Sequence, residues 1–387
     1  MKGRPKVALL IESSNTYARD LLHGIRAWLR DNEAWSIRLT EHGRGANPPS
    51  WLKNWQGDGI IARVENKFIA NTLKATGLPV VDVSAALRNP PFDRVATDSE
   101  AATQLAFEHL KERGLTQFAY CGDSRFQWSL QRQKYFANIV KFSGYECLDY
   151  TSPQDARIPE REFDALINWL KRLPKPVGIL ACYDIRGQQI LEACQQEGIR
   201  VPDEVAVIGV HNDELLCDLC DPPLSSVIPN ARQAGYKAAE ILSLLMVDKL
   251  RKKTLQTLMI EPIGVASRQS TDLIAIDDEK ISQAIRFIRN EAEKGISVAD
   301  VLQAVPMSRT LLERKFKKTL GTTPHSYINK IRIQKIKTLI TTTQLPISEI
   351  ADRCGYEHIE YLSVAFKRET GLSPTEFRSA HKTQPTR

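Results

Sequence analysis

Short apolar runs alternate with longer amphipathic stretches over residues 1–272. Each run is four to six residues long, which suits a buried strand, and the stretches between the runs have helical spacing. Buried strands separated by helices predict parallel, doubly wound sheets. The apolar runs span residues 7–11, 59–62, 79–83, 118–122, 177–181 and 205–210.

Beyond Asp277 the apolar positions recur three or four residues apart, and two stretches match each other at an offset of fifty residues. Such a set of matched residue types does not recur by chance, so we predict two copies of one helical unit. The paired positions are Leu312 and Leu362, Phe316 and Phe366, Lys317-Lys318 and Lys367-Arg368, Gly321 and Gly371, Pro324 and Pro374, and Tyr327 and Phe377.

Each copy has the pattern of a helix-turn-helix. A leucine and a phenylalanine four residues apart anchor one helical face, the glycine suits a left-handed cap, and the proline begins the next helix. A short amphipathic helix and a tight turn precede each copy, at residues 298–305 and 347–354. Between the copies, residues 324–341 predict one long basic helix that holds the two units apart.

The excess positive charge is confined to this C-terminal part. Residues 278–387 hold 19 Lys+Arg and 12 Asp+Glu, whereas the preceding residues hold 34 of each. A basic module joined to a neutral one is the distribution expected of a DNA-binding unit attached to a partner domain.

Several classes of protein are excluded by what the chain lacks. No apolar run approaches the roughly 18 residues that span a bilayer, and no signal peptide precedes the first strand, so we expect a cytoplasmic protein without membrane contacts. Seven scattered cysteines, with Cys217-x-x-Cys220 the one close pair, predict reduced thiols and no metal site. Without a phosphate-binding glycine motif or a catalytic constellation, we expect no enzyme and no cofactor.

Polar and aromatic side chains follow the ends of successive predicted strands, where doubly wound sheets bind their ligands. Paired donors and acceptors suit sugar hydroxyls, and aromatic faces suit the C–H face of a sugar ring. We therefore predict a cleft for a monosaccharide effector. The candidate residues are Asn15, Tyr17, Arg19, Asp82, Trp128, Arg132, Tyr183, Asp184, His211 and Asn212.

The C-terminal repeat closely resembles the DNA-binding domain of the AraC family. The second copy, from residues 347–351 through Gly355-Tyr356 to Phe377-Arg378, carries most of the family signature. The resemblance covers about a hundred residues and implies that two recognition helices enter successive major grooves on one face of DNA.

Exposed residues early in each recognition helix are the expected readers of base edges, since arginine pairs with guanine and glutamate with cytosine. The basic residues that follow are expected to contact phosphates. The candidate DNA contacts are Ser308, Arg309, Thr310, Glu313, Lys317, His358, Glu360, Ser363, Lys367 and Arg368.

The first part of the chain resembles the periplasmic-binding-protein-like sensor of the lac and gal repressor family. In that fold two lobes, here about residues 7–111 and 112–224, are joined by crossovers; later segments return to both lobes, and ligand binding closes them. The matching segments, in the family's order, are residues 58–61, 97–99, 207–210, 222–227 and 261–271.

Those repressors carry their helix-turn-helix before the sensor, whereas here the DNA-binding part follows it. This arrangement resembles the xylose-operon regulators along the whole chain. The resemblance implies a homodimeric activator that binds D-xylose and double-stranded DNA and contacts RNA polymerase. Its sensor domain would span residues 1–272 and its AraC-type domain residues 273–387, with a linker at about 270–278.

One position departs from that family. His211 stands where the family usually has an acidic residue that binds sugar hydroxyls. A neutral or charged imidazole cannot accept hydrogen bonds as a carboxylate does. A different monosaccharide therefore remains an alternative, as does a sensor that serves only dimerisation, while an enzyme fused to a DNA reader is disfavoured.

Overall fold

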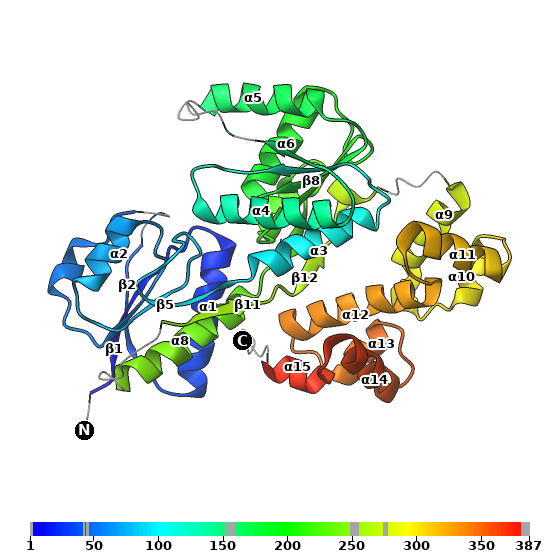
Figure 1. Ribbon diagram of the computed structural model, residues 1–387. Helices are drawn as coiled ribbons and strands as arrows, with labels where there is room; N and C mark the ends of the chain where they lie inside the picture. The colour runs from blue at the N-terminus through cyan, green and yellow to red at the C-terminus, as the bar shows by residue number, and fades with distance from the viewer. Residues whose placement is uncertain are drawn as a thin grey trace.

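The computed structural model describes residues 3–41, 43, 46–150, 152, 159–247, 255–273 and 278–380. These residues form two six-stranded sheets with flanking helices, followed by a group of helices coloured from yellow to red in Figure 1. The predicted linker lies partly outside the described residues, because 274–277 are not among them.

The first sheet has the strand order β11-β5-β4-β3-β1-β2, and every neighbouring pair is parallel. The predicted runs at residues 7–11, 59–62 and 79–83 form its centre. The exposed edge strand β2 was not predicted, because none of its side chains is buried and it has no apolar run. The strands are β1 (Lys6–Leu10), β2 (Ser36–Leu39), β3 (Gly59–Ala62), β4 (Val80–Asp82), β5 (Asp93–Thr97) and β11 (Thr257–Ile260).

The second sheet has the strand order β12-β10-β9-β8-β6-β7, and only β12 runs antiparallel to its neighbour among the described strands. Its central strands β8 and β9 are buried along their whole length. The strands are β6 (Phe118–Cys121), β7 (Cys147–Tyr150), β8 (Val177–Ala181), β9 (Val205–Val210), β10 (Ser225–Ile228) and β12 (Gly264–Ala266).

Helices cover both sheets. They are α1 (Thr16–Asp31), α2 (Lys67–Lys74), α3 (Ser99–Lys111), α4 (Gln127–Phe142), α5 (Pro159–Arg172), α6 (Asp184–Gln196), α7 (Glu214–Leu219) and α8 (Ala231–Val247). Short 3-10 turns lie at Ser50–Asn54, Gln269–Thr271 and Ala292–Lys294.

A segment late in the chain completes the core of the first lobe, since α8 packs on α1 and on the first sheet. The two helices cross closely at two glycines. A β-carbon on Gly24 would lie 1.9 Å from the carbonyl oxygen of Arg232, and one on Gly235 would lie 2.0 Å from that of Leu21. The expectation that later segments return to both lobes is confirmed, because β11 joins the first sheet and β10 and β12 join the second.

The predicted boundary between the lobes at residue 111 was wrong. Helix α3 belongs to the second lobe, where Ala102, Phe107 and Leu110 pack with Phe118 and Phe136 in one core. The chain therefore crosses between the lobes directly after β5. Nothing in the apolar spacing of α3 distinguishes a helix packed on its own sheet from one packed on the next.

The C-terminal helices form two small cores that share one long helix. α12 (Pro324–Thr342) contributes Tyr327 and Ile328 to the first core and Ile333, Ile336 and Ile340 to the second. The prediction of one long helix between the two units is confirmed. The helices are α9 (Glu279–Glu291), α10 (Val298–Ala304), α11 (Arg309–Leu320), α12, α13 (Ile347–Arg353), α14 (Ile359–Thr370) and α15 (Pro374–Ala380).

The predicted caps are also present. Gly321 ends α11 with φ of 70° and Gly371 ends α14 with φ of 77°, both in the left-handed region that glycine adopts without strain. Pro324 and Pro374 begin the helices that follow. These features give the two units the same local geometry fifty residues apart.

All seven cysteines are free thiols. Within the described part of the chain, no group of His, Cys, Asp or Glu side chains has the arrangement of a metal site. The same described residues include no helix with the length and apolar character needed to cross a membrane.

Candidate functional site

A small cavity lies between the two lobes, at the carboxyl ends of the strands. Its volume is about 40 Å³, and both lobes contribute to its wall. The first lobe supplies residues that follow β1, β3 and β4 and residues at the end of β5, and the second supplies residues from α3, from α4 and from the loop after β9. The lining residues are Tyr17, Arg63, Val83, Ser84, Ala85, Ala96, Thr97, Ser99, Trp128, Arg132 and His211.

Aromatic rings line this interlobe cavity from both sides. The ring centroids of Tyr17 and His211 lie 5.2 Å apart, and those of Trp128 and His211 lie 6.4 Å apart. Phe126 stacks on Trp128 at 5.2 Å, and Tyr183 meets it edge-on at 5.7 Å. The packing of Trp128 between two other rings fixes the orientation of its indole.

Two buried arginines bring donors to the cavity. Arg63 forms ion pairs with Glu12 and, at 3.1 Å, with Glu65, while Arg132 donates to the carbonyl oxygen of Cys182. Burial alone would lower the pKa of Arg63, but the two carboxylates outweigh it and raise that pKa. The Nε atoms of Arg63 and Arg132 are buried without a hydrogen-bond partner among the described residues. Both are donors whose hydrogen bond a ligand oxygen would satisfy.

Two further carboxyls lie behind the strand ends. Asp82 accepts hydrogen bonds from Arg94 at 3.0 Å and from two backbone amides. Asp184 accepts from the Ser226 hydroxyl at 2.6 Å and from the backbone amide of Asp213 at 2.8 Å. Burial raises the pKa of each carboxyl to about 7.

The first helix-turn-helix presents a polar recognition helix, α11. Ser308 caps it, accepting a hydrogen bond from the amide of Leu311 at 3.3 Å. Arg309 and Glu313 are exposed and pair with each other at 3.0 Å. Thr310 and Lys317 are also exposed on this helix.

The second recognition helix, α14, begins after His358, whose ring lies 5.6 Å from that of Tyr361. Glu360 and Lys367 are exposed, and Ser363 is partly buried. Arg368 is exposed beside Glu369, at 3.7 Å. α11 therefore presents a polar, partly basic surface to solvent, whereas α14 exposes Tyr361 and Val364 among its polar side chains.

Three family models match successive parts of this chain. The XylR N-terminal domain matches residues 6–100, the periplasmic binding protein-like domain residues 107–271, and the helix-turn-helix domain residues 301–380. The chain is 35% identical to the xylose operon regulatory protein of Escherichia coli (strain K12), over 98% of each chain. The chain belongs to the family of xylose operon regulatory proteins.

Other members of the family are also similar to this chain along nearly its whole length. The xylose operon regulatory protein of Haemophilus influenzae is 34% identical, over 96% of this chain and 98% of that one. A solved structure described as the xylose-binding transcription activator XylR is 34% identical over 98% of this chain and 99% of that chain, with a TM-score of 0.64. The family confirms the predicted fold and function class, a sugar-responsive transcription regulator with an AraC-type domain rather than an enzyme.

Within this family fold, four of the ten predicted effector residues line the interlobe cavity: Tyr17, Trp128, Arg132 and His211. Tyr183 lies directly behind Trp128. The remaining five lie outside the cavity wall, and their hydrogen bonds explain why.

Three of these five belong to the first lobe. Asn15 caps α1 by accepting from the amide of Ala18. Arg19 is exposed, donates to the carbonyl oxygen of Ser13 and is not among the residues that line the cavity. Asp82 is occupied by Arg94 and backbone amides. Arg19 and Asp82 are not among the residues that line the interlobe cavity, and each bonds to groups of its own lobe.

The other two belong to the second lobe. Asp184 is buried beneath the loop after β9, where Ser226 and the backbone of Asp213 occupy its oxygens. Asn212 accepts a hydrogen bond from Arg268 at 2.9 Å and lines the interdomain side of the loop rather than the interlobe cavity. These residues hold the loop that carries His211.

Arg63 and Thr97 also line the interlobe cavity and were not predicted from the sequence. Arg63 directly follows a predicted strand, so the strand-end rule that selected Tyr17 applies to it equally. The run Arg63-Val64-Glu65 has two charged residues around one apolar residue, a pattern that also suits a solvated loop. The structure places that run in the interior instead, with Arg63 between two glutamates.

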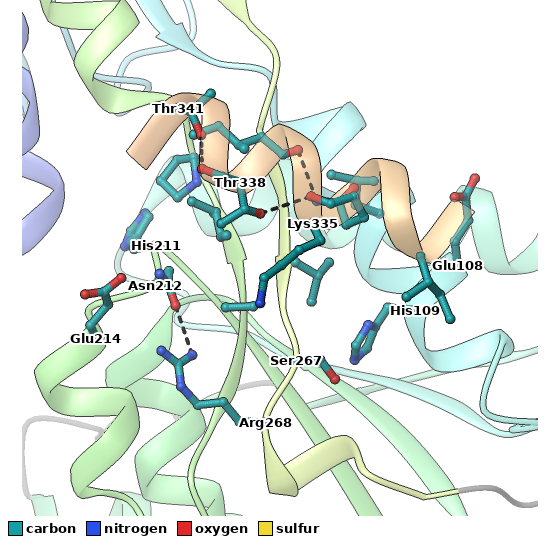
Figure 2. A pocket seen from close by; sticks show the side chains of 18 of the residues that line it. Glu108, His109, His211, Asn212, Glu214, Ser267, Arg268, Lys335, Thr338 and Thr341 are labelled. Atoms are coloured by element: carbon teal, nitrogen blue, oxygen red, sulfur yellow. Dashed lines mark hydrogen bonds between the residues drawn. The ribbon is translucent and has the colours of Figure 1, made fainter. Parts of the chain in front are cut away.

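A second, larger cavity of about 1070 Å³ separates the sensor from the DNA-binding helices. Figure 2 shows His211, Asn212 and Arg268 on the sensor side of this interdomain cavity, and Lys335, Thr338 and Thr341 of α12 opposite them. His211 lines both cavities, so the loop after β9 lies between the effector cleft and the DNA-binding part.

Direct contacts join α9 and α12 to the sensor. Lys330 of α12 pairs with Glu112 and, at 3.6 Å, with Glu108 of α3. Arg289 of α9 donates to the carbonyl oxygen of Glu112 at 3.1 Å, and Gln334 of α12 donates to that of Ile263 at 3.3 Å. The basic residues of α12 therefore face the sensor and their own domain rather than the surface that the recognition helices present.

Proposed function

We propose that this transcription regulator binds D-xylose in the interlobe cavity and that the bound sugar controls how its two helix-turn-helix units engage DNA. The observation that carries the proposal is the cavity wall itself. Aromatic faces and buried donors from both lobes converge on one point at the strand ends. The names of the family members supply the sugar, since a solved relative is described as xylose-binding.

The cavity wall suggests a role for each group. The rings of Tyr17 and Trp128 would pack on the C–H faces of a pentose. The guanidiniums of Arg63 and Arg132 would donate to hydroxyl oxygens, and the hydroxyls of Ser84 and Thr97 can both donate and accept. His211 would bond to one more hydroxyl in place of the carboxylate expected at this position.

The lobes have to separate before a pentose can enter. A volume of about 40 Å³ accommodates water molecules but not a sugar ring. The amide of Thr16 in the first lobe faces a carboxylate oxygen of Asp213 in the second at 3.5 Å, so this link would open with the cleft. A ligand shifts such an equilibrium only by its difference in affinity for the two arrangements.

The contacts of α12 and α9 supply a route from the cleft to DNA. Both helices touch α3 or the strands of the second lobe, and His211 and Asn212 form the near wall of the interdomain cavity. We propose that movement of the second lobe relative to the first reorients the DNA-binding part, residues 273–387, relative to the sensor, residues 1–272. In a homodimer that contacts RNA polymerase in the cytoplasm, this movement would change the spacing of the four recognition helices.

The proposal is tested by the melting temperature of the full chain with and without D-xylose. A ligand that binds the native state at a hundredfold excess over its Kd stabilises by about 2.7 kcal/mol, which here corresponds to roughly 5 °C. Trp128→Ala and Arg132→Ala should abolish the shift. Arg19→Ala is the matched control, because Arg19 is exposed and is not among the residues that line the cavity, and it should leave the shift intact.

Three outcomes count against the proposal in different ways. A shift with another pentose or a hexose but not with D-xylose would keep the cleft and change the effector. No shift with any monosaccharide would favour a sensor that serves only dimerisation. A shift that survives Trp128→Ala and Arg132→Ala would place the sugar elsewhere in the molecule.

A further inference from the structure

We infer that the two recognition helices read DNA by different chemistry, with α11 reading guanine through Arg314 and α14 reading thymine methyl groups through Val364 and Tyr361. The inference rests on the helix-turn-helix domain of the family and does not depend on which effector binds the sensor.

The outward direction of each recognition helix follows from its two buried anchors. In α11 these are Leu312 and Phe316, and in α14 they are Leu362 and Phe366; all four are inaccessible to solvent. The residue midway between two anchors lies about 200° around the helix from either one, since each residue advances about 100°. The central outward residue is therefore Arg314 in α11 and Val364 in α14.

The exposure of these side chains agrees with that geometry. Arg314 is exposed, and no carboxylate among the described residues lies within ion-pair distance of it. Its neighbour Arg309 is instead paired with Glu313. Arg314 is thus the arginine of α11 whose donors are available to a base edge.

The corresponding face of α14 has two exposed apolar or aromatic side chains at its centre. Val364 is 69% exposed, and Tyr361, three residues before it, is 68% exposed. Glu360, four residues before Val364, is also exposed on this side of the helix. Fifty residues earlier, the position of Val364 holds Arg314. The two units share anchors, caps and basic flanks but differ at the residues that point outward.

The surroundings of this apolar face favour DNA over a protein partner. Lys367 and Arg368 are exposed one turn beyond Val364, at the positions that Lys317 and Lys318 hold in α11. Cations at these positions suit the phosphates on either side of a major groove. A protein-docking face of similar size would not need the same flanking cations on both helices.

The two kinds of side chain select different bases. An arginine donates to O6 and N7 of guanine, which no other base presents together in the major groove. An apolar side chain packs against the C5 methyl group of thymine, which uracil lacks. Burying one such group is worth about 0.8 kcal/mol, so its loss should weaken binding roughly fourfold.

The test begins with the full chain and a pool of random-sequence duplexes, selected with and without D-xylose. The selected site should have one half with a preferred guanine and one half rich in thymine. Replacing the thymines of that second half by deoxyuridine should weaken binding roughly fourfold per contacted methyl group, while the same replacement in the first half should have no effect.

Two variants assign the halves. Arg314→Ala should remove the guanine preference of the first half and weaken binding roughly five- to hundredfold. Val364→Ala should remove the sensitivity to deoxyuridine in the second half. Lys367→Ala is the control, since it should weaken binding to all sequences and leave both preferences in place.

Two results would overturn the inference. Binding that is unchanged by deoxyuridine in either half would show that thymine methyl groups are not read. A Val364→Ala variant with unaltered DNA binding but impaired transcription with purified RNA polymerase would assign the apolar face to a protein partner. In either case the sugar-dependent melting shift would be unaffected, so the proposed effector would stand or fall separately.

Discussion

At the scale of single residues, the buried carboxyl of Asp184 links the effector loop to solution pH. Burial raises its pKa to about 7, so between about pH 4 and pH 7 the native state holds a proton that the unfolded chain has released. Stability contributed by this proton is present below the unfolded pKa and is lost as the pH rises through the folded one. We expect the free energy of unfolding to fall with rising pH over this range.

Asp184→Asn should flatten that dependence. The difference in urea unfolding free energy between about pH 5 and pH 7.5 should shrink relative to the wild type, by on the order of 2 kcal/mol. An unchanged pH dependence in the variant would show that Asp184 does not hold a proton in the native state.

Asp123 is the matched control because its shift has the opposite sign. Burial would raise the pKa of Asp123, but hydrogen bonds and charge from Arg125 outweigh burial and lower it. Its contribution is present above the unfolded pKa and is lost as the pH falls below about 4. Asp123→Asn should therefore destabilise the protein at neutral pH and approach wild-type stability in acid.

Sequence reasoning placed side chains at the wall of the interlobe cavity where position along a strand determines the environment. Tyr17, Trp128 and His211 were found because they follow strand ends, and the strands were visible as apolar runs. It failed where partners from elsewhere decide the outcome. Asp82 and Asp184 also lie at strand ends, but their carboxylate oxygens accept hydrogen bonds from Arg94 and Ser226. No local sequence pattern predicts these two pairings.

At the scale of elements, α12 connects the sensor and the DNA-binding part through Lys330. Lys330→Glu would place a third carboxylate beside Glu108 and Glu112 and repel the helix from α3. The expected result is a loss of coupling rather than a loss of folding, since partly exposed ion pairs contribute little to stability. The ratio of DNA affinities with and without D-xylose should fall toward one.

Lys335→Glu provides the comparison on the same helix. Lys335 pairs with Glu293, which belongs to the DNA-binding part, at 3.1 Å. The same change of charge there should leave the D-xylose dependence of DNA affinity in place. If both variants behave alike, the effect is one of net charge on DNA binding and not of the contact with α3.

A second element-level prediction concerns salt. Lys317 of α11 and Lys367 of α14 hold matched exposed positions, and each is expected to contact one phosphate. Replacing either lysine by alanine should reduce the slope of log K against log salt by about 1 without changing base preference. A variant with the wild-type slope would place that lysine away from the DNA backbone.

Elements themselves were largely predictable, since anchors, caps and prolines at a fixed offset located both helix-turn-helix units. The lobe to which each helix belongs could not be predicted in the same way. α3 has the apolar face of any helix on a sheet, and only the cores show that Phe107 packs with Phe118 of the second lobe. Edge strand β2 was not predicted for a related reason. All four of its side chains are exposed, so its sequence shows no alternation of apolar and polar residues.

At the scale of the whole molecule, the loop after β9 borders both the interlobe cavity and the interdomain cavity. His211 lies against Tyr17 and Trp128 in the cleft and also borders the interdomain cavity beside α12 (Figure 2). Family membership implies regulation of transcription. The position of this loop suggests how a sugar bound between the lobes would affect the DNA-binding part, residues 273–387. Coupling of this kind typically changes affinity five- to 150-fold.

The most direct test is the Kd of the full chain for a selected DNA duplex, measured by fluorescence anisotropy with and without D-xylose. We expect saturating D-xylose to change the Kd of the wild type by roughly tenfold and to leave that of Trp128→Ala unchanged. A Kd that is the same with and without D-xylose in the wild type, or that responds equally in Trp128→Ala, would contradict control of DNA binding from the interlobe cavity.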